Sequence, residues 1–105
     1  MTYDLTTQEG RKNAIDFFDK YGWAINIYAW GIRKIFKIFT HEDTIKSQTE
    51  ITKELIKTGK ANGVDEMEIT VDNMAGLEIG SEVEGTPISA IIGTNGKTTL
   101  KIKYK

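Results

Sequence analysis

The sequence predicts a two-layer α+β fold in which two N-terminal helices pack on a four-stranded antiparallel sheet. Apolar residues recur about every 3.6 positions before Asn62-Gly63 and every second position after it, which are the periods of an amphipathic helix and of a half-buried strand. A chain of 105 residues without cysteine is also long enough to bury one core without disulfides or metals. We therefore expect a single domain, with a helical part at 7–62 and an antiparallel sheet part at 65–105.

The first helix is expected to begin near Thr7 and to run to Phe39. Thr6 and Glu9 have the spacing of a capping box, which satisfies backbone donors at a helix start. Gly22 is the weak point, because glycine costs about 1 kcal/mol in a helix interior, and the helix is either continuous or bends there. The residues that keep to one helical stripe are Ala14, Phe18, Tyr21, Ile25, Tyr28, Ile32, Ile35 and Phe39.

A second helix is expected to end at about Ala61. Thr40 and Asp43 can cap its beginning, because their side-chain oxygens accept hydrogen bonds from free backbone N–H groups. Asn62-Gly63 can end it, since glycine readily adopts the left-handed conformation of a C-terminal cap. The expected apolar contacts of this helix are Ile45, Ile51, Leu55 and Ile56.

The first two of the four strands are expected to form a hairpin. Met67, Ile69 and Val71 alternate with polar residues. Leu77 and Ile79 are predicted to face Val71 and Ile69 across a loop that runs from Asp72 to Gly76.

The last two strands are expected at about Ile88 to Ile92 and at Thr98 to Tyr104, joined by a three-residue Thr94-Asn95-Gly96 turn. A two-residue Asn95-Gly96 turn would shift the register and oppose an apolar residue to a lysine, so the longer turn is preferred. The predicted pairs are Ile88 with Ile102, Ala90 with Leu100 and Ile92 with Thr98.

Composition favours a cytoplasmic protein. The first ten residues lack the basic and then apolar run of a secretory signal, and the stretch without charge from Tyr21 to Ile32 is short of the roughly 20 residues that span a bilayer. Membrane contact is not expected. The absence of cysteine fits a reducing compartment. A net charge of -1 argues against a dedicated nucleic-acid binder, whose affinity comes mostly from clustered Lys and Arg.

Eight of the ten aromatic residues lie between Phe17 and Phe39. An unbroken helix over 7–39 would be about 50 Å long, whereas a domain of this size has a radius of gyration of about 13 Å. We therefore expect the helix to overhang the sheet and to bury its aromatic rows against another chain, most simply in a two-fold homodimer. A bend at Gly22 with intramolecular burial is the competing interpretation. The predicted partner interface is Phe17, Tyr21, Trp23, Ile27, Tyr28 and Trp30.

The segment from Gly93 to Thr99 resembles the ATP-binding loop of the Mur ligases, the amide-forming enzymes of cell-wall synthesis. The resemblance covers seven residues. It implies that Lys97 neutralises phosphates, that Thr98 helps to bind magnesium and that a helix follows the loop. In this chain the residues after Thr99 alternate between apolar side chains and lysines as a strand does, so Asn95-Gly96 is predicted to be a hairpin turn instead.

The leading functional hypothesis is a non-catalytic binding or regulatory protein, a small regulator, inhibitor or adaptor, that self-associates through its aromatic helix. No catalytic residues, cofactor or metal site are predicted. The single histidine, His41, lies between Thr40 and Glu42 with Asp43 next, and three adjacent residues cannot all ligate one ion.

Two other hypotheses come from different classes of protein. One is a small-ligand module that captures an anionic metabolite or nucleotide at a subunit interface, with aromatic rings for stacking and cations for phosphate. Its candidate ligand-binding residues are Arg33, Lys37, Lys97 and Lys101. The other is a nucleotide-hydrolysing enzyme that uses the 93–99 loop.

Overall fold

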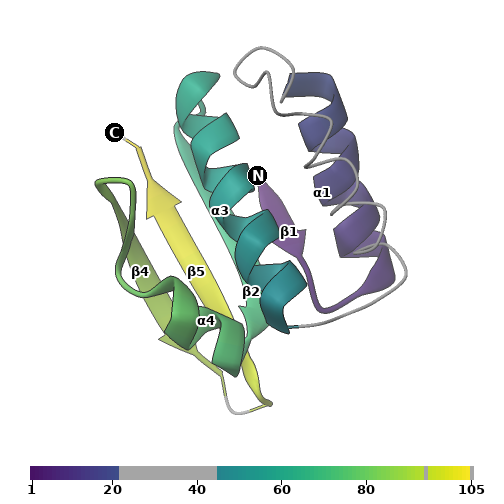
Figure 1. Ribbon diagram of the computed structural model, residues 1–105, viewed down its shortest axis with the longest axis vertical. Coiled ribbons are helices and arrows are strands. Elements are labelled where there is room, and N and C mark those ends of the chain that lie inside the picture. The colour runs from purple at the N-terminus through teal and green to yellow at the C-terminus, as the bar shows by residue number, and fades with distance from the viewer. Residues whose placement is uncertain (22–44, 94, 105) are drawn as a thin grey trace.

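The described helices and strands form two layers. The computed structural model describes residues 1–21, 45–93 and 95–104, and within these ranges three helices lie on one face of a five-stranded sheet (Figure 1). No described helix covers the other face of the sheet, which we call the open face. In chain order the elements are β1 (Thr2–Asp4), α1 (Gln8–Tyr21), α3 (Ile45–Ala61), β2 (Glu66–Asp72), α4 (Asn73–Ile79), β3 (Glu82–Val83), β4 (Thr86–Ile92) and β5 (Lys97–Lys103).

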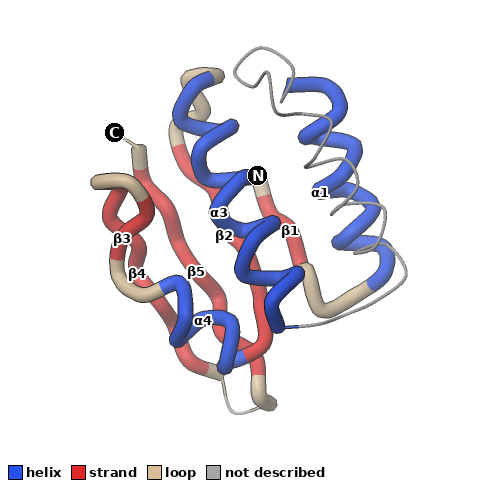
Figure 2. The backbone as a smooth tube through the Cα atoms, viewed as in Figure 1, coloured by secondary structure: helices blue, strands red, loops and turns tan. Residues whose placement is uncertain are grey.

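The long pairing between β2 and β5 forms the centre of the sheet. The order across the sheet is β1-β2-β5-β4-β3, and β2 and β5 run antiparallel over seven residue pairs (Figure 2). Alternate side chains of the two strands face the helices and are buried: Met67, Ile69, Val71, Leu100 and Ile102. The apolar face of α3 packs on them with Ile51, Leu55 and Ile56, so the core lies between α3 and the two central strands.

The predicted end of the second helix is confirmed. Gly63 has φ +71°, and the Val64 N–H donates to the Gly59 carbonyl at 3.0 Å, which is the long hydrogen bond of a Schellman cap. The helix α3 ends at Ala61. Its predicted caps at Thr40 and Asp43 lie outside the described residues.

The predicted beginning of the first helix near Thr7 is also confirmed, with a different cap. The Thr7 hydroxyl accepts a hydrogen bond from the Gly10 N–H at 3.0 Å, whereas Thr6 donates its own N–H to the Asp4 carboxylate at 2.9 Å. The capping position is therefore Thr7, one residue later than the Thr6–Glu9 spacing indicated. The helix α1 is described to Tyr21, and its predicted continuation to Phe39 lies outside the described residues.

The strand β1 corrects the prediction of an all-antiparallel sheet. It pairs parallel to β2, with Tyr3 opposite Ile69, and the Leu5 N–H donates to the Thr70 carbonyl at 2.8 Å. A strand of three residues is too short to show a period of two, which is why the sequence pattern missed it. Burial of Tyr3 and Leu5 holds β1 in place.

The helix α4 corrects the prediction of a strand at Leu77 and Ile79. The Asp72 carboxylate accepts the Met74 N–H at 3.0 Å and so caps a helix where a hairpin loop was expected. Gly76 allows this helix to lie close to Thr98 of β5, because a Cβ at Gly76 would meet Thr98 at 3.2 Å. The antiparallel partner of β2 is therefore β5, which is far away in the sequence.

The β4–β5 hairpin has the predicted register. Ile88, Ala90 and Ile92 stand opposite Ile102, Leu100 and Thr98. Gly96 has φ +80°, a conformation that glycine adopts without strain. The two-residue strand β3, which pairs with Thr86 and Pro87, was not predicted because it too is shorter than one period of alternation.

The contact between β1 and α1 predicts an unusual result for a glycine in a helix. Gly10→Ala would place a Cβ against the Asp4 carbonyl oxygen. We expect a loss of about 1–3 kcal/mol in the free energy of unfolding, although helix propensity alone would favour alanine by about 1 kcal/mol. Lys12→Ala, at an exposed position of the same helix, is the control and should be nearly neutral. Urea denaturation that showed Gly10→Ala to be more stable than the wild type would contradict the placement of β1.

Candidate interaction surface

Most of the predicted aromatic interface lies outside the described residues. Phe17 is described and is 6% exposed, with its ring centroid 5.7 Å from that of Tyr3, so it packs within the chain against β1. Tyr21 is the last residue of α1. The predicted site residues outside the described ranges are Trp23, Ile27, Tyr28, Trp30, Arg33 and Lys37, and His41 is also outside them.

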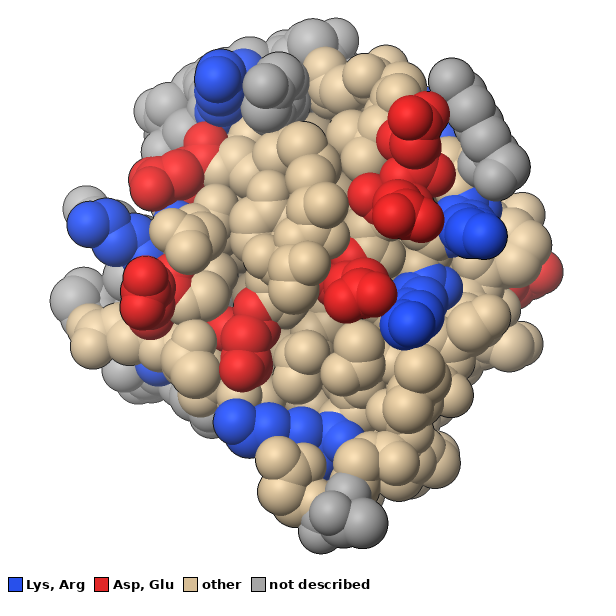
Figure 3. Space-filling model, turned by 180° about the vertical axis from the view of Figure 1, so that it is seen from behind, with Lys and Arg blue, Asp and Glu red and all other residues tan. Residues whose placement is uncertain are grey.

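The other two predicted ligand-binding residues, Lys97 and Lys101, lie on the open face of the sheet. Figure 3 shows acidic and basic side chains side by side on this face. Lys101 Nζ lies 3.7 Å from Glu68 Oε1 on β2, and Lys97 Nζ lies 4.0 Å from Asp4 Oδ2 on β1. Lys101 therefore faces a carboxylate of the neighbouring strand β2, and Lys97 reaches across β2 to a carboxylate of β1.

The Lys101–Glu68 contact belongs to a ladder of complementary side chains between β2 and β5. We call it the charge ladder; its pairs are Glu66–Lys103, Glu68–Lys101, Thr70–Thr99 and Asp72–Lys97. The two threonine hydroxyls in the middle are 3.3 Å apart. The pairs alternate with the buried pairs of the same strands. Since opposite charges across strands are favourable and like charges are not, the ladder favours this register over others.

A shallow hollow of about 630 Å³ lies over one end of the charge ladder. Its charged lining consists of two acids and two lysines: Glu66, Glu68, Lys101 and Lys103. An anion bound there would approach carboxylates as closely as lysines. The open face is therefore better suited to stabilising the strand register than to capturing an anionic metabolite.

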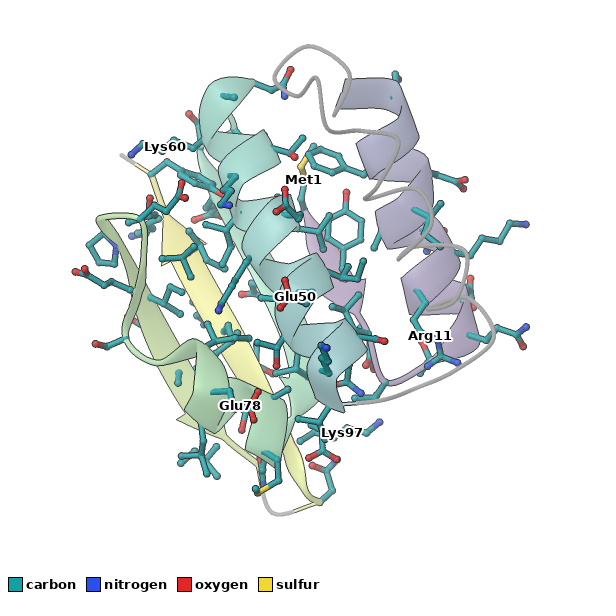
Figure 4. All side chains as sticks on the ribbon, viewed as in Figure 1. Met1, Arg11, Glu50, Lys60, Glu78 and Lys97 are labelled. Carbon is teal, nitrogen blue, oxygen red and sulfur yellow. The ribbon has the colours of Figure 1, made fainter. Side chains whose placement is uncertain are left out.

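The structure around Lys97 and Thr98 differs from that of a phosphate-binding loop. The residues after the turn form the strand β5, so no helix follows this loop as the resemblance implies. The Asn73 N–H at the beginning of α4 lies at the turn, but it donates to the Gly96 carbonyl at 3.0 Å. The Thr98 side chain is 3% exposed, and its hydroxyl donates to Asn73 Oδ1 at the beginning of α4. Figure 4 shows Lys97 at the edge of the molecule, at the end of the sheet where α4 lies.

Exposed apolar side chains occur at the C-terminal end of β4 and on the neighbouring helix α4. Ile92 and Leu77 are each 72% exposed and Ile91 is 51% exposed. Ile92 is the cross-strand neighbour of Thr98, on which α4 packs through Gly76, the residue before Leu77. Ala90 points to the same face as Ile92 and is also exposed. We call Leu77, Ala90, Ile91 and Ile92 the β4 edge surface.

The backbone at this edge has unpaired groups in the described part of the chain. β3 pairs with β4 only at Thr86 and Pro87, and the Ile88 N–H donates to the Ser81 carbonyl at 2.9 Å. Successive residues of a strand direct their N–H and C=O groups to opposite sides. Ala90 and Ile92 therefore direct theirs outward, as Ile88 does, and no described strand lies beside them.

The sequence pattern did not identify this surface. Its signal was the run Ala90-Ile91-Ile92, which is apolar on both faces of the strand and has no charged neighbour from Pro87 to Gly96. On β2 and β5, by contrast, outward-facing positions carry Glu, Asp, Lys or Thr. A strand that alternates less clearly than its neighbours is a sign of an interaction face.

Other sites of chemistry do not emerge among the described residues. They contain no group of three or more His, Cys, Asp and Glu side chains able to hold a metal ion. Tyr104 has a structural role, because its hydroxyl donates to the Ile56 carbonyl at 2.8 Å, and burial raises the pKa of Tyr104 to about 12. No helix in the described ranges is long and apolar enough to cross a membrane.

Comparison with models of known protein families, with curated proteins and with solved structures gives no match for this chain. Its function is therefore inferred from its own residues.

The charge ladder predicts the effect of reversing one charge. Lys101→Glu places a second carboxylate opposite Glu68 and should lower the free energy of unfolding by up to about 1 kcal/mol. The double variant Glu68→Lys with Lys101→Glu restores an opposite pair and should recover most of the loss. Denaturation at low and high salt measures both effects. A double variant no more stable than Lys101→Glu alone would show that the pairing does not contribute.

Proposed function

We propose that the protein is a non-catalytic cytoplasmic binding protein that works by self-association. The observation that supports this proposal best is the β4 edge surface, where exposed apolar side chains and unpaired backbone groups occur on the same uncharged segment. Apolar side chains gain free energy when another surface covers them, and free backbone groups gain hydrogen bonds.

This edge differs from the way in which monomeric proteins usually end a sheet. Natural edge strands are commonly very short, carry charges or proline, or are covered by another element, and these features discourage pairing with other chains. The opposite edge, β1, has only three residues. Where β4 pairs with β3, it contains Pro87, and the exposed Glu82 and Glu84 lie on β3 and in the turn that follows it. From Ser89 to Ile92 the strand carries no charge or proline, and no described strand pairs with its outer side. Its composition fits a surface that another chain covers.

The geometry of the polar residues supports binding over catalysis. Lys97 and Lys101 face carboxylates, Thr98 is buried, and the Tyr104 hydroxyl is held by a backbone carbonyl. These groups stabilise the fold where they stand. Of the predicted aromatic interface, Phe17 is buried within the chain. Trp23, Ile27, Tyr28 and Trp30 stay predicted contributors to self-association and lie outside the described residues.

Self-association is tested by the mass of the protein in solution. Light scattering and sedimentation velocity on the whole chain should give at least twice 11.8 kDa at micromolar concentration, with a mass that falls on dilution as an equilibrium dimer requires. A mass near 11.8 kDa at every concentration tested would overturn the proposed function.

A thermal shift with ATP and magnesium tests the enzyme alternative. A ligand that binds the folded state raises the melting temperature. We expect no rise for the wild type and none for Lys97→Ala, because the loop is followed by a strand and not by the helix of a phosphate-binding loop. A rise in the wild type that disappears in Lys97→Ala would favour nucleotide binding by the 93–99 loop instead.

A further inference from the structure

The free backbone groups of β4 are arranged so that a second copy of the same strand can satisfy them. In the described part of the chain, the outward N–H and C=O groups beyond Ile88 are those of Ala90 and Ile92. The Ile88 N–H is already bonded to Ser81, and the Gly93 N–H turns inward to the Lys97 carbonyl at 2.8 Å. The open stretch of edge therefore contains two residues that each offer one donor and one acceptor.

We propose that two copies of the chain pair through β4 in antiparallel orientation, with the two-fold axis at Ile91. This proposal rests on the proposed function and names its interface. In this register Ala90 of one copy stands opposite Ile92 of the second copy, and the reverse pair follows by symmetry. Each such pair exchanges two hydrogen bonds, so four bonds satisfy the outward N–H and C=O groups of Ala90 and Ile92 in both copies. The two sheets then join into one continuous sheet.

The side chains agree with this register. Ile91 meets Ile91 of the second copy on the open face of the joined sheet. Ala90 and Ile92 meet on the other face, at the end of the sheet where Leu77 is exposed. The four residues from Ser89 to Ile92 carry no charge, so the symmetric pairing opposes no like charges. Burial of these apolar side chains would add to the four hydrogen bonds.

The charges that flank β4 favour the antiparallel direction. Its N-terminal end adjoins β3 and the exposed acids Glu82 and Glu84, and its C-terminal end lies near Lys97 in the sequence. Glu84 and Lys97 also have partners within the chain, Lys57 at 3.3 Å and Asp4 at 4.0 Å, so their effect on the direction of pairing is small. Antiparallel pairing brings the acidic end of one copy toward the lysine end of the second copy. A parallel pairing would bring acid toward acid and lysine toward lysine, which opposes association.

Cysteine cross-linking tests the position of the axis, because the chain has no cysteine of its own. At a non-hydrogen-bonded antiparallel pair the Cα atoms are about 4.5 Å apart, within the range of a disulfide. Ile91→Cys should therefore form a covalent dimer under mild oxidation. Ser89→Cys, exposed on the same face and strand, is the matched control. In this register the Cα atoms of position 89 in the two copies would be about 14 Å apart, so this variant should stay largely uncross-linked.

A charge at the edge tests whether this surface carries the association. Ile92→Lys places a cation beside Ala90 of the second copy and should halve the mass of the dimer in light scattering. Met74→Lys is the control, because Met74 is also an exposed apolar residue and the change in charge is the same, but it lies on α4 and not on the strand that is proposed to pair. It should leave the mass unchanged. Circular dichroism of each variant checks that it is folded.

Amide exchange of the wild type gives an independent readout that needs no substitution. The amides of Ser89 and Ile91 are protected by β5 in any state of association. Those of Ala90 and Ile92 should become protected only as concentration rises and the dimer forms.

The outcomes separate the two proposals. A wild type that is monomeric overturns both. If the wild type is a dimer, three results would each overturn the β4 pairing and leave self-association through another surface. They are an unchanged mass for Ile92→Lys, cross-linking of Ile91→Cys no better than that of Ser89→Cys, and amides of Ala90 and Ile92 that stay unprotected.

Discussion

The antiparallel pairing of β2 with β5 is the constraint on which the rest of the fold depends. One side of these strands supplies the buried centre of the core, and the other side carries the charge ladder. A shift of one residue would turn Met67, Ile69 and Val71 to water and the acids of β2 into the core. The burial of one face and the charge pairing of the other therefore favour the same register.

The positions of the other elements follow from that pairing. With β5 on one side of β2, the only free edge of β2 takes β1, and the chain returns across the sheet through the helices on one face. The short helix α4 occupies the link between β2 and β3, joined to α3 where the Thr49 hydroxyl lies 3.4 Å from Glu78 Oε2. β4 is then left on the outer side of β5, where β3 is the only described strand that pairs with it. The exposure of the β4 edge surface is thus a consequence of the order of the strands.

Elements whose signal lies in residues close together in the chain were predicted correctly from the sequence. The end of α3 at Asn62-Gly63 and the register of β4 with β5 depend on residues close together in the chain, whose periodicity and turn chemistry can be read directly. The strands β1 and β3 are too short to show a period. The prediction of a strand at Leu77 and Ile79 was wrong because it paired β2 with the next apolar residues along the chain, as a hairpin would. The actual partner of β2 lies about 30 residues later, and the matching acids and lysines of β2 and β5 were the signal for it.

Cross-strand nuclear Overhauser contacts test the central pairing most directly. In non-hydrogen-bonded antiparallel pairs the two α-protons lie close together. The account predicts strong contacts between the α-protons of Glu68 and Lys101 and between those of Thr70 and Thr99. Contacts from β2 to residues 77–79, or contacts shifted by one residue along β5, would contradict it.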